Sequence, residues 1–125
     1  MFRFRSDSGS AAVEFALVVP LLITLVLGIV EFGRAYNVQG SLSAAAREGV
    51  RVMAVSNSPT AARAATKNAA VLNPAITDAQ VTISPASCTP ASNVTLTITY
   101  PLAWVTGFFP GSLTLKGKGV MRCGG

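Results

Sequence analysis

Residues 10–30 read SAAVEFALVVPLLITLVLGIV, and this stretch decides the fold. From Ala11 to Val30 the only charged residue is Glu14. A helix of about 20 residues is roughly 30 Å long, which matches the hydrocarbon core of a bilayer. The composition agrees, because only 12% of the 125 residues are charged, against about a quarter in soluble globular chains. The stretch is therefore predicted to be a membrane-spanning helix.

The charges that flank this run differ in sign. Arg3 and Arg5 precede it, and Glu31 follows it. By the positive-inside rule, the N-terminus is expected to stay in the cytoplasm while the rest of the chain is exported. The competing interpretation is a secretory signal peptide, cleaved after about Gly28. Signal peptides usually have a shorter apolar run that ends in a small-x-small site, so the anchor is favoured.

The helical pattern continues past the span, and the whole helix is expected over about residues 10–54. Apolar residues recur there at steps of three and four and predict one stripe of an amphipathic helix. The stripe consists of Ile29, Phe32, Tyr36, Leu42, Ala46, Val50 and Met53. Gly33, Gly40 and Gly49 weaken the helix but let another backbone approach it closely.

A second, alanine-rich helix is predicted after a break near residue 57. Ser58 suits its N-cap and Pro59 its first position. The Asn73–Pro74 pair should end it, so it is expected to reach about Leu72.

Beyond this helix the apolar period changes from helical to alternating, which predicts strands. Three strands are expected, at residues 79–84, 93–100 and 112–116, the last resuming at 119–122. Gly117 and Gly119 suggest a bulge inside the third strand. Along the second strand, the apolar side chains are expected to face the long helix: Val94, Leu96, Ile98 and Tyr100. The predicted fold class is α+β, with a small three-stranded antiparallel sheet.

The residue types present limit the chemistry. The chain has no histidine and two cysteines, so neither a four-ligand zinc site nor a Ser–His or Cys–His catalytic pair can form. Its five acidic residues are spread apart, and no cofactor motif is present. We therefore expect no enzyme, no metal and no cofactor. The basic residues do not gather into one patch, so nucleic acid is not an expected partner.

Cys88 and Cys123 leave two interpretations open. They form one disulfide if the C-terminal region lies in an oxidising compartment, or they remain two unpaired buried cysteines. The other signs of export favour the disulfide.

Glu14 is the most informative single residue. A carboxylate in the apolar part of a membrane helix costs about 2.5–3.5 kcal/mol on insertion scales, so it usually has a partner. Its position near the start of the span also lets it reach water at the cytoplasmic interface. These two interpretations are evenly balanced by position alone.

The residues around Glu14 resemble a known processing motif. Residues 9–15, GSAAVEF, are similar to the cleavage site of type IV pilin-like proteins, where a basic leader ends in glycine and glutamate is the fifth mature residue. A longer set of segments resembles the TadE-like family, minor pseudopilins of the tight-adherence (Tad, or Flp) pilus system. These segments are SAAVEFALVVPLL at 10–22, LGIVEFGR at 27–34 and AAAREGVR at 44–51. The resemblance covers about residues 9–54 and is weak beyond them.

The resemblance implies that prepilin peptidase cleaves between Gly9 and Ser10, although an uncleaved anchor is the alternative. Cleavage would free an ammonium group at Ser10, one helical turn from Glu14 or facing it on a neighbouring subunit. Pairing these charges in lipid would offset the cost of burying either one and would fix the axial register between subunits.

The apolar connection PLAWVTGFFP, residues 101–110, has two interpretations. A small domain needs its large side chains, so Leu102, Trp104 and Phe108 would cover the helix stripe as core. Alternatively, Trp104, Phe108 and Phe109 would form an exposed contact patch for another pilus subunit or for the outer membrane-facing surface.

These expectations divide the chain into a leader-like segment (1–9), a transmembrane and amphipathic helix (10–54) and an exported, pilin-like head (55–125). The expected function is assembly of an adhesive Tad pilus. The expected partners are the membrane, other pilin-like subunits, the pilus assembly machinery and prepilin peptidase. The expected location is the cytoplasmic membrane in a single pass, and after processing the pilus or cell surface. The alternative function is a membrane-anchored extracytoplasmic binding or sensor protein that never enters a filament.

Overall fold

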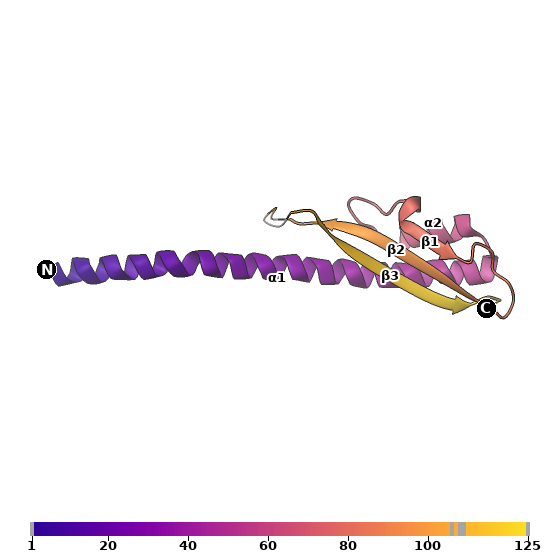
Figure 1. The fold of residues 1–125 in the computed structure, drawn as a ribbon, viewed down its shortest axis with the longest axis horizontal. Helices are drawn as coiled ribbons and strands as arrows, with labels where there is room; N and C mark the ends of the chain where they lie inside the picture. Colours follow the sequence, from indigo (N-terminus) through magenta and orange to yellow (C-terminus); the bar gives the residue numbers. More distant parts are fainter. Residues whose placement is uncertain (1, 106, 108–109, 125) are drawn as a thin grey trace. The chain divides into compact units, whose positions relative to one another are not determined.

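The computed structural model describes residues 2–105, 107 and 110–124, with side chains described from Gly9 onward. Helix α1 (Phe2–Ser56) is followed by helix α2 (Pro59–Ala69), the short 3₁₀ helix η1 (Asp78–Gln80) and three strands. The strands are β1 (Val81–Ser84), β2 (Asn93–Ala103) and β3 (Ser112–Arg122). This order confirms the predicted α+β class (Figure 1). The chain forms two compact units, which divide between Gly33 and Arg34.

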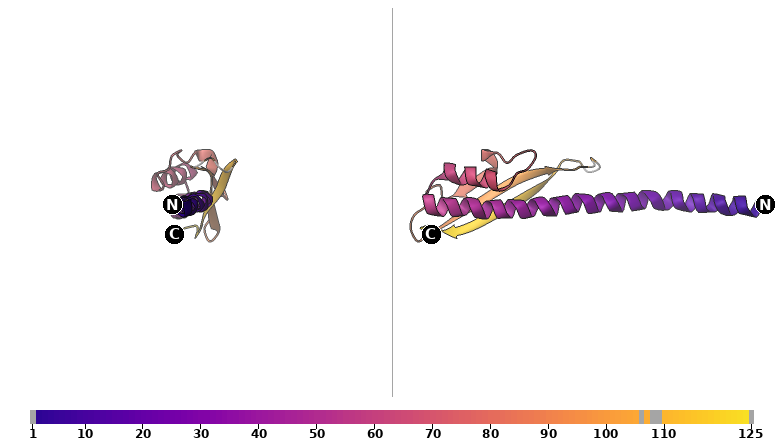
Figure 2. Two further views of the ribbon diagram at one scale, coloured as in Figure 1. Left: turned by 90° about the vertical axis from the view of Figure 1, so that its left-hand side faces the viewer. Right: turned by 180° about the vertical axis from the view of Figure 1, so that it is seen from behind.

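The three strands form one antiparallel sheet in the order β1–β2–β3. The side chains that were expected to face the helix are all buried: Val94, Leu96, Ile98 and Tyr100. The hydroxyl of Tyr100 donates a hydrogen bond to the carbonyl oxygen of Pro74 at 2.7 Å, so this buried polar group is satisfied. In Figure 2, α2 and the sheet lie beside the C-terminal part of α1.

The predicted bulge in β3 was wrong. The strand pairs with β2 without interruption, with Gly117 opposite Ile98 and Gly119 opposite Leu96. The glycines serve another purpose, because a Cβ atom at Gly117 would lie 2.5 Å from the carbonyl oxygen of Leu42. A Cβ atom at Gly119 would lie 2.7 Å from the carbonyl oxygen of Ala46. Residues two apart share one face of a strand, so the two glycines together let β3 rest directly on the backbone of α1.

The predicted apolar stripe of α1 is correct in one half only. Its later members are buried in the head: Leu42, Ala46, Val50 and Met53. Its earlier members, Ile29, Phe32 and Tyr36, are exposed. They lie in or next to the apolar span, where hydrophobic residues occur on every side of the helix. Hydrophobicity there carries no information about which face packs against protein.

Helix α2 begins as predicted, since the Ser58 hydroxyl oxygen accepts a hydrogen bond from the backbone N–H of Ala61 at 3.2 Å. It ends at Ala69, three residues before the predicted Leu72. Its buried side chain Thr66 lies against Gly49 of α1, where a Cβ atom would collide with it. The sequence predicted a close approach of another backbone at Gly49, but the atoms next to it belong to the side chains of Thr66 and Leu96.

Replacing Gly117 or Gly119 with alanine is expected to destabilise the head. The added methyl group meets helix backbone, which cannot rotate away, and overpacking of this kind costs about 1–3 kcal/mol. A domain of this size loses about 4–8 °C in melting temperature per kcal/mol. Circular dichroism of the full chain in detergent micelles measures the change.

Gly40→Ala is the matched control, because no atom lies within 4 Å of a Cβ added there. This helical alanine is expected to leave the melting temperature unchanged or to raise it slightly. A Gly117→Ala variant as stable as the parent would show that β3 does not rest on the helix backbone.

Candidate functional site

The apolar span lies on the first part of α1, and its side chains are not covered by protein. Helix α1 from Gly9 onward is long and apolar enough to cross a membrane, and the most apolar part of it is not buried. Large apolar side chains point outward on all sides of this segment, from Val13 and Phe15 to Ile29 and Val30. One such helix near the N-terminus suggests a single-pass membrane anchor.

Helix α1 runs without interruption through Pro20. Four residues later the Thr24 hydroxyl donates a hydrogen bond to the carbonyl oxygen of Pro20 at 2.7 Å. In lipid every polar group needs a partner within the protein, and this bond satisfies the only hydroxyl between Ala11 and Val30.

The residues of the predicted processing and register sites lie on one exposed turn of α1. Gly9, Ser10 and Glu14 are all helical and exposed. Ser10 and Glu14 are four residues apart, so they share one face of the helix with a rise of about 6 Å between them. No atom lies within 4 Å of a Cβ built at Gly9. The turn therefore presents the Gly9–Ser10 bond and the Glu14 carboxylate together.

Glu31 follows the apolar span, and its i,i+3 spacing to Arg34 predicts a place on the polar side of the helix. Its side chain is 2% exposed, and it is the one acidic residue among the described side chains that is buried. The available signal was its position in LGIVEFGR, residues 27–34, one of the segments on which the family resemblance rests.

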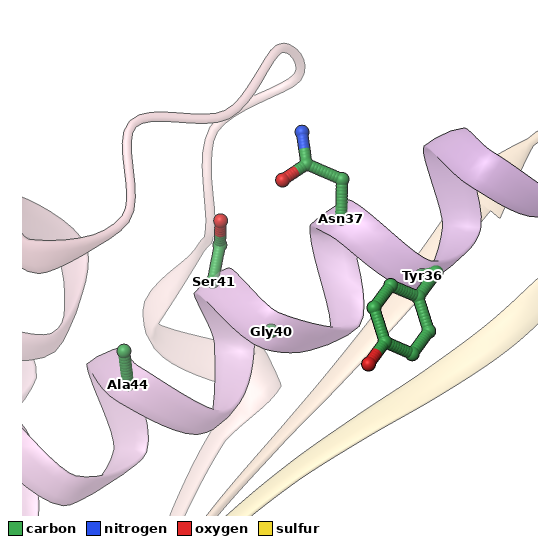
Figure 3. Close-up of a pocket in the computed structure, with 5 residues that line it drawn as sticks. All are labelled: Tyr36, Asn37, Gly40, Ser41 and Ala44. Atoms are coloured by element: carbon green, nitrogen blue, oxygen red, sulfur yellow. The ribbon is translucent and has the colours of Figure 1, made fainter.

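One face of helix α1 is uncovered around Gly40. Figure 3 shows Tyr36, Asn37, Gly40, Ser41 and Ala44 along one side of α1, where they line a shallow pocket. Tyr36 is 83% exposed, and no atom lies near the missing side chain of Gly40. In the described part of the chain, no other backbone lies close to Gly40, although a glycine would permit it.

Two side chains of α1 donate hydrogen bonds to the hairpin of β2 and β3. Arg34 donates a hydrogen bond from Nη1 to the carbonyl oxygen of Ala103 at 2.6 Å. Gln39 donates from Nε2 to the carbonyl oxygen of Lys116 at 2.5 Å. Both acceptors are backbone atoms, so the bonds fix where the strands lie along the helix.

The structure describes part of the apolar connection 101–110. Leu102 is buried in the core, as the first interpretation expected. Trp104 is half-buried and Val105 is exposed. Phe108 and Phe109 lie outside the described residues. The contact patch of Trp104, Phe108 and Phe109 therefore stays a prediction.

The two cysteines lie together at the far end of the head. Cys88 and Cys123 form a disulfide with their Cα atoms 5.7 Å apart. Around it, the N–H of Cys88 donates to Oδ1 of Asn57 at 2.7 Å, and the N–H of Gly124 donates to the carbonyl oxygen of Ala54 at 3.1 Å. The disulfide thus joins the segment after β1 to the end of β3, next to the last turn of α1.

Among the described residues, no group of three or more His, Cys, Asp or Glu side chains is placed to hold a metal ion. What the structure does define is an N-terminal helix long and apolar enough to cross a membrane, with an exposed glycine and glutamate near its start, and a small α+β head. This arrangement fits the class of single-pass membrane proteins with an α+β head.

The comparison with family models agrees with this class. Residues 9–51 match the model of the family described as TadE-like protein, which confirms the resemblance in this segment. Together with the apolar helix, the match fits a membrane protein related to the Tad pilus. No curated protein and no solved structure matches the chain.

Reducing the disulfide is expected to destabilise the head by about 3–4 kcal/mol, because a cross-link across 35 residues restricts the unfolded chain. The melting temperature of the full chain in micelles, with and without reductant, measures the change. A Cys88→Ser/Cys123→Ser variant serves as the control, and its melting temperature should not respond to reductant. Two free thiols, titrated in the denatured, non-reduced protein, would contradict the pairing.

Proposed function

We propose that this chain is a minor pilin-like subunit that contributes to the assembly of an adhesive Tad pilus. One observation carries the proposal: within the segment that matches the TadE-like model, Gly9 and Glu14 are both exposed on the first described turns of the helix, at the spacing of the pilin-like motif. The apolar helix that follows supplies the membrane anchor that a subunit needs before assembly.

The chemistry of the turn explains why both residues are needed. Cleavage between Gly9 and Ser10 by prepilin peptidase removes the basic leader and leaves an ammonium group on Ser10. The Glu14 carboxylate lies one turn away on the same face and pairs with that ammonium group or with the one on a neighbouring subunit. In a low-dielectric surrounding an unpaired charge is costly, so only the axial offset that pairs the charges is stable.

The two parts of the chain have separate tasks in this proposal. The apolar segment 11–30 associates with the corresponding segments of other pilin-like subunits, while the head, outside the cytoplasm, provides specificity. Arg3 and Arg5 hold the uncleaved N-terminus on the cytoplasmic side. The disulfide agrees with a head in an oxidising compartment.

Processing is tested by N-terminal sequencing and intact mass of the chain isolated from membranes. The expected mature chain starts at Ser10. Gly9→Leu is expected to block cleavage and preserve the leader, while Gly28→Leu, at another open helical glycine, leaves cleavage unchanged. An intact Met1 in the parent protein would favour the plain anchor of the binding or sensor alternative. A start after Gly28 would identify a signal peptide.

Glu14→Ala tests the register. The variant is expected to insert and be processed, but its amount in sheared pilus fractions falls by roughly tenfold or more, since losing about 1.4 kcal/mol of pairing is a tenfold loss in association. Glu48→Ala is the control, because Glu48 lies on the same helix and pairs with Arg51 at the surface of the head. Equal recovery of both variants in pili would exclude a register role for Glu14.

A further inference from the structure

The unit Arg34–Gly125 is strongly basic. Its sequence has eight lysine and arginine residues against two acidic ones, which gives a formal charge of +6. Both carboxylates already have partners, since Glu48 pairs with Arg51 at 3.5 Å and Asp78 pairs with Lys67 at 2.7 Å. This unit therefore has no further carboxylate to neutralise its other cations.

Three of these cations lie on one face of β3. Lys116, Lys118 and Arg122 are separated by even numbers of residues, so they share a face of the strand. Gly117 and Gly119 face helix α1, and the cations therefore lie on the opposite, outer face of the sheet. Figure 2 shows α2 and the C-terminal part of α1 together on the other side of the sheet. All three cationic side chains are exposed, and none of them forms an ion pair in the described part of the chain.

The same face of β2 and β1 carries hydroxyl groups. Thr99 lies opposite Lys116 in the register of β2 and β3. Thr97 lies opposite Lys118 on one side and opposite Thr82 of β1 on the other. The outer face carries these side chains with a hydroxyl group: Thr82, Ser84, Thr95, Thr97, Thr99, Ser112 and Thr114. None of their hydroxyls forms a hydrogen bond within the described residues, so all of them are available to a ligand.

We propose that this outer face of the sheet, called the cationic face below, binds a linear polysaccharide that carries carboxylate groups. The ammonium groups of Lys116 and Lys118 pair with carboxylates of the polymer, while the threonines of β2 exchange hydrogen bonds with its sugar hydroxyls. The charges and hydroxyls of the face carry this inference. Only the choice of a ligand found outside the cytoplasm rests on the proposed function, which places the head there.

The composition of the face favours a sugar polymer over a protein. The centre of a specific protein interface is apolar and rich in aromatic side chains. Tyr100 is the only aromatic residue within the three strands, and it is buried on the other face. The apolar side chains on the cationic face are Pro101, Ala103 and Val120, and the cation rows separate Val120 from the other two. Such a face offers charge and hydrogen bonds without an apolar centre.

The absence of aromatic side chains from this face also argues against single-stranded nucleic acid. Proteins that bind such strands combine a basic groove with aromatic rings on which the bases stack. A carboxylated polysaccharide requires no stacking platform, because its carboxylates and hydroxyls match the ammonium and hydroxyl groups of the face directly.

The spacing of the cations implies that the ligand is a polymer. Lys116 and Lys118 are about 7 Å apart along the strand, and Arg122 lies about 14 Å beyond Lys118. An exposed ion pair is weak by itself, so one sugar that meets one cation binds poorly. A chain long enough to meet several cations binds much more tightly, because the later contacts form within one complex.

The test uses the full chain in micelles of a nonionic detergent and isothermal titration calorimetry, with polygalacturonate as the probe. The chain is expected to bind this polymer roughly tenfold or more tightly than it binds monomeric galacturonate. High salt is expected to weaken the binding, because it screens exposed charges. Dextran, a neutral polymer, is expected not to bind.

Two double variants separate the cationic face from the overall charge. Lys116→Gln/Lys118→Gln is expected to weaken the binding of polygalacturonate about tenfold or more. Arg47→Gln/Arg51→Gln removes the same charge from exposed residues of α1, and it is expected to change the binding less than twofold.

Thr97→Val tests the hydroxyls of the face. Valine keeps the shape of threonine and suits a strand, so the melting temperature should not fall. The variant is expected to weaken the binding of polygalacturonate roughly threefold, because a hydrogen bond to the sugar is lost.

Several results would overturn the inference. Equal weakening by the two double variants would show that overall charge binds the polymer, and no binding of polygalacturonate would remove the ligand. Tighter binding of poly-L-glutamate or of single-stranded polythymidylate would identify an acidic polypeptide or a nucleic acid as the partner instead.

The test is independent of pilin processing. A chain that starts at Ser10 but does not bind polygalacturonate overturns the inference and leaves the proposed function standing. A chain with an intact Met1 that binds the polymer through the cationic face supports the inference and contradicts processing.

Discussion

Helix α1 has two parts with different kinds of side chain, and the packing of the head depends on the second part. From Ala11 to Val30 the helix has apolar side chains on every side and Glu14 as its one charge, which suits a membrane span. After Arg34 it buries only one face, and the residues of that face are small where the sheet approaches, including Ala45, Ala46 and Gly49. Small residues on the helix and glycines on β3 let two backbones meet. The sheet can therefore cover the helix closely even though the head is short of large side chains.

The sequence predicted the elements better than the contacts between them. Alternation along residues 93–100 predicted both the strand and its buried face, because each side chain of a half-buried strand reports its own surroundings. The role of Gly117 and Gly119 was missed, because a glycine shows that a side chain is absent without showing why. Their spacing of two residues was the usable signal, since it puts both glycines on one face, whereas a bulge needs only one.

The two parts of α1 that carry functional residues, the turn near Glu14 and the region of Arg34, were predictable from the sequence to different extents. The turn from Gly9 to Glu14 is a local motif, so its geometry follows from helical spacing alone. The bond from Arg34 to Ala103 joins residues 69 apart in sequence, and no local pattern encodes it. The prediction that the packed stripe includes Ile29, Phe32 and Tyr36 was wrong for a related reason. Next to a membrane span, hydrophobicity reports on the lipid as well as on the protein core.

In the proposed function, residues 11–30 exchange lipid for neighbouring helices when a subunit enters a filament. Under that proposal Glu14 gains by the exchange, because an ammonium partner in the filament would replace a charge held in or near lipid. The cost of holding a carboxylate in the span would therefore favour assembly.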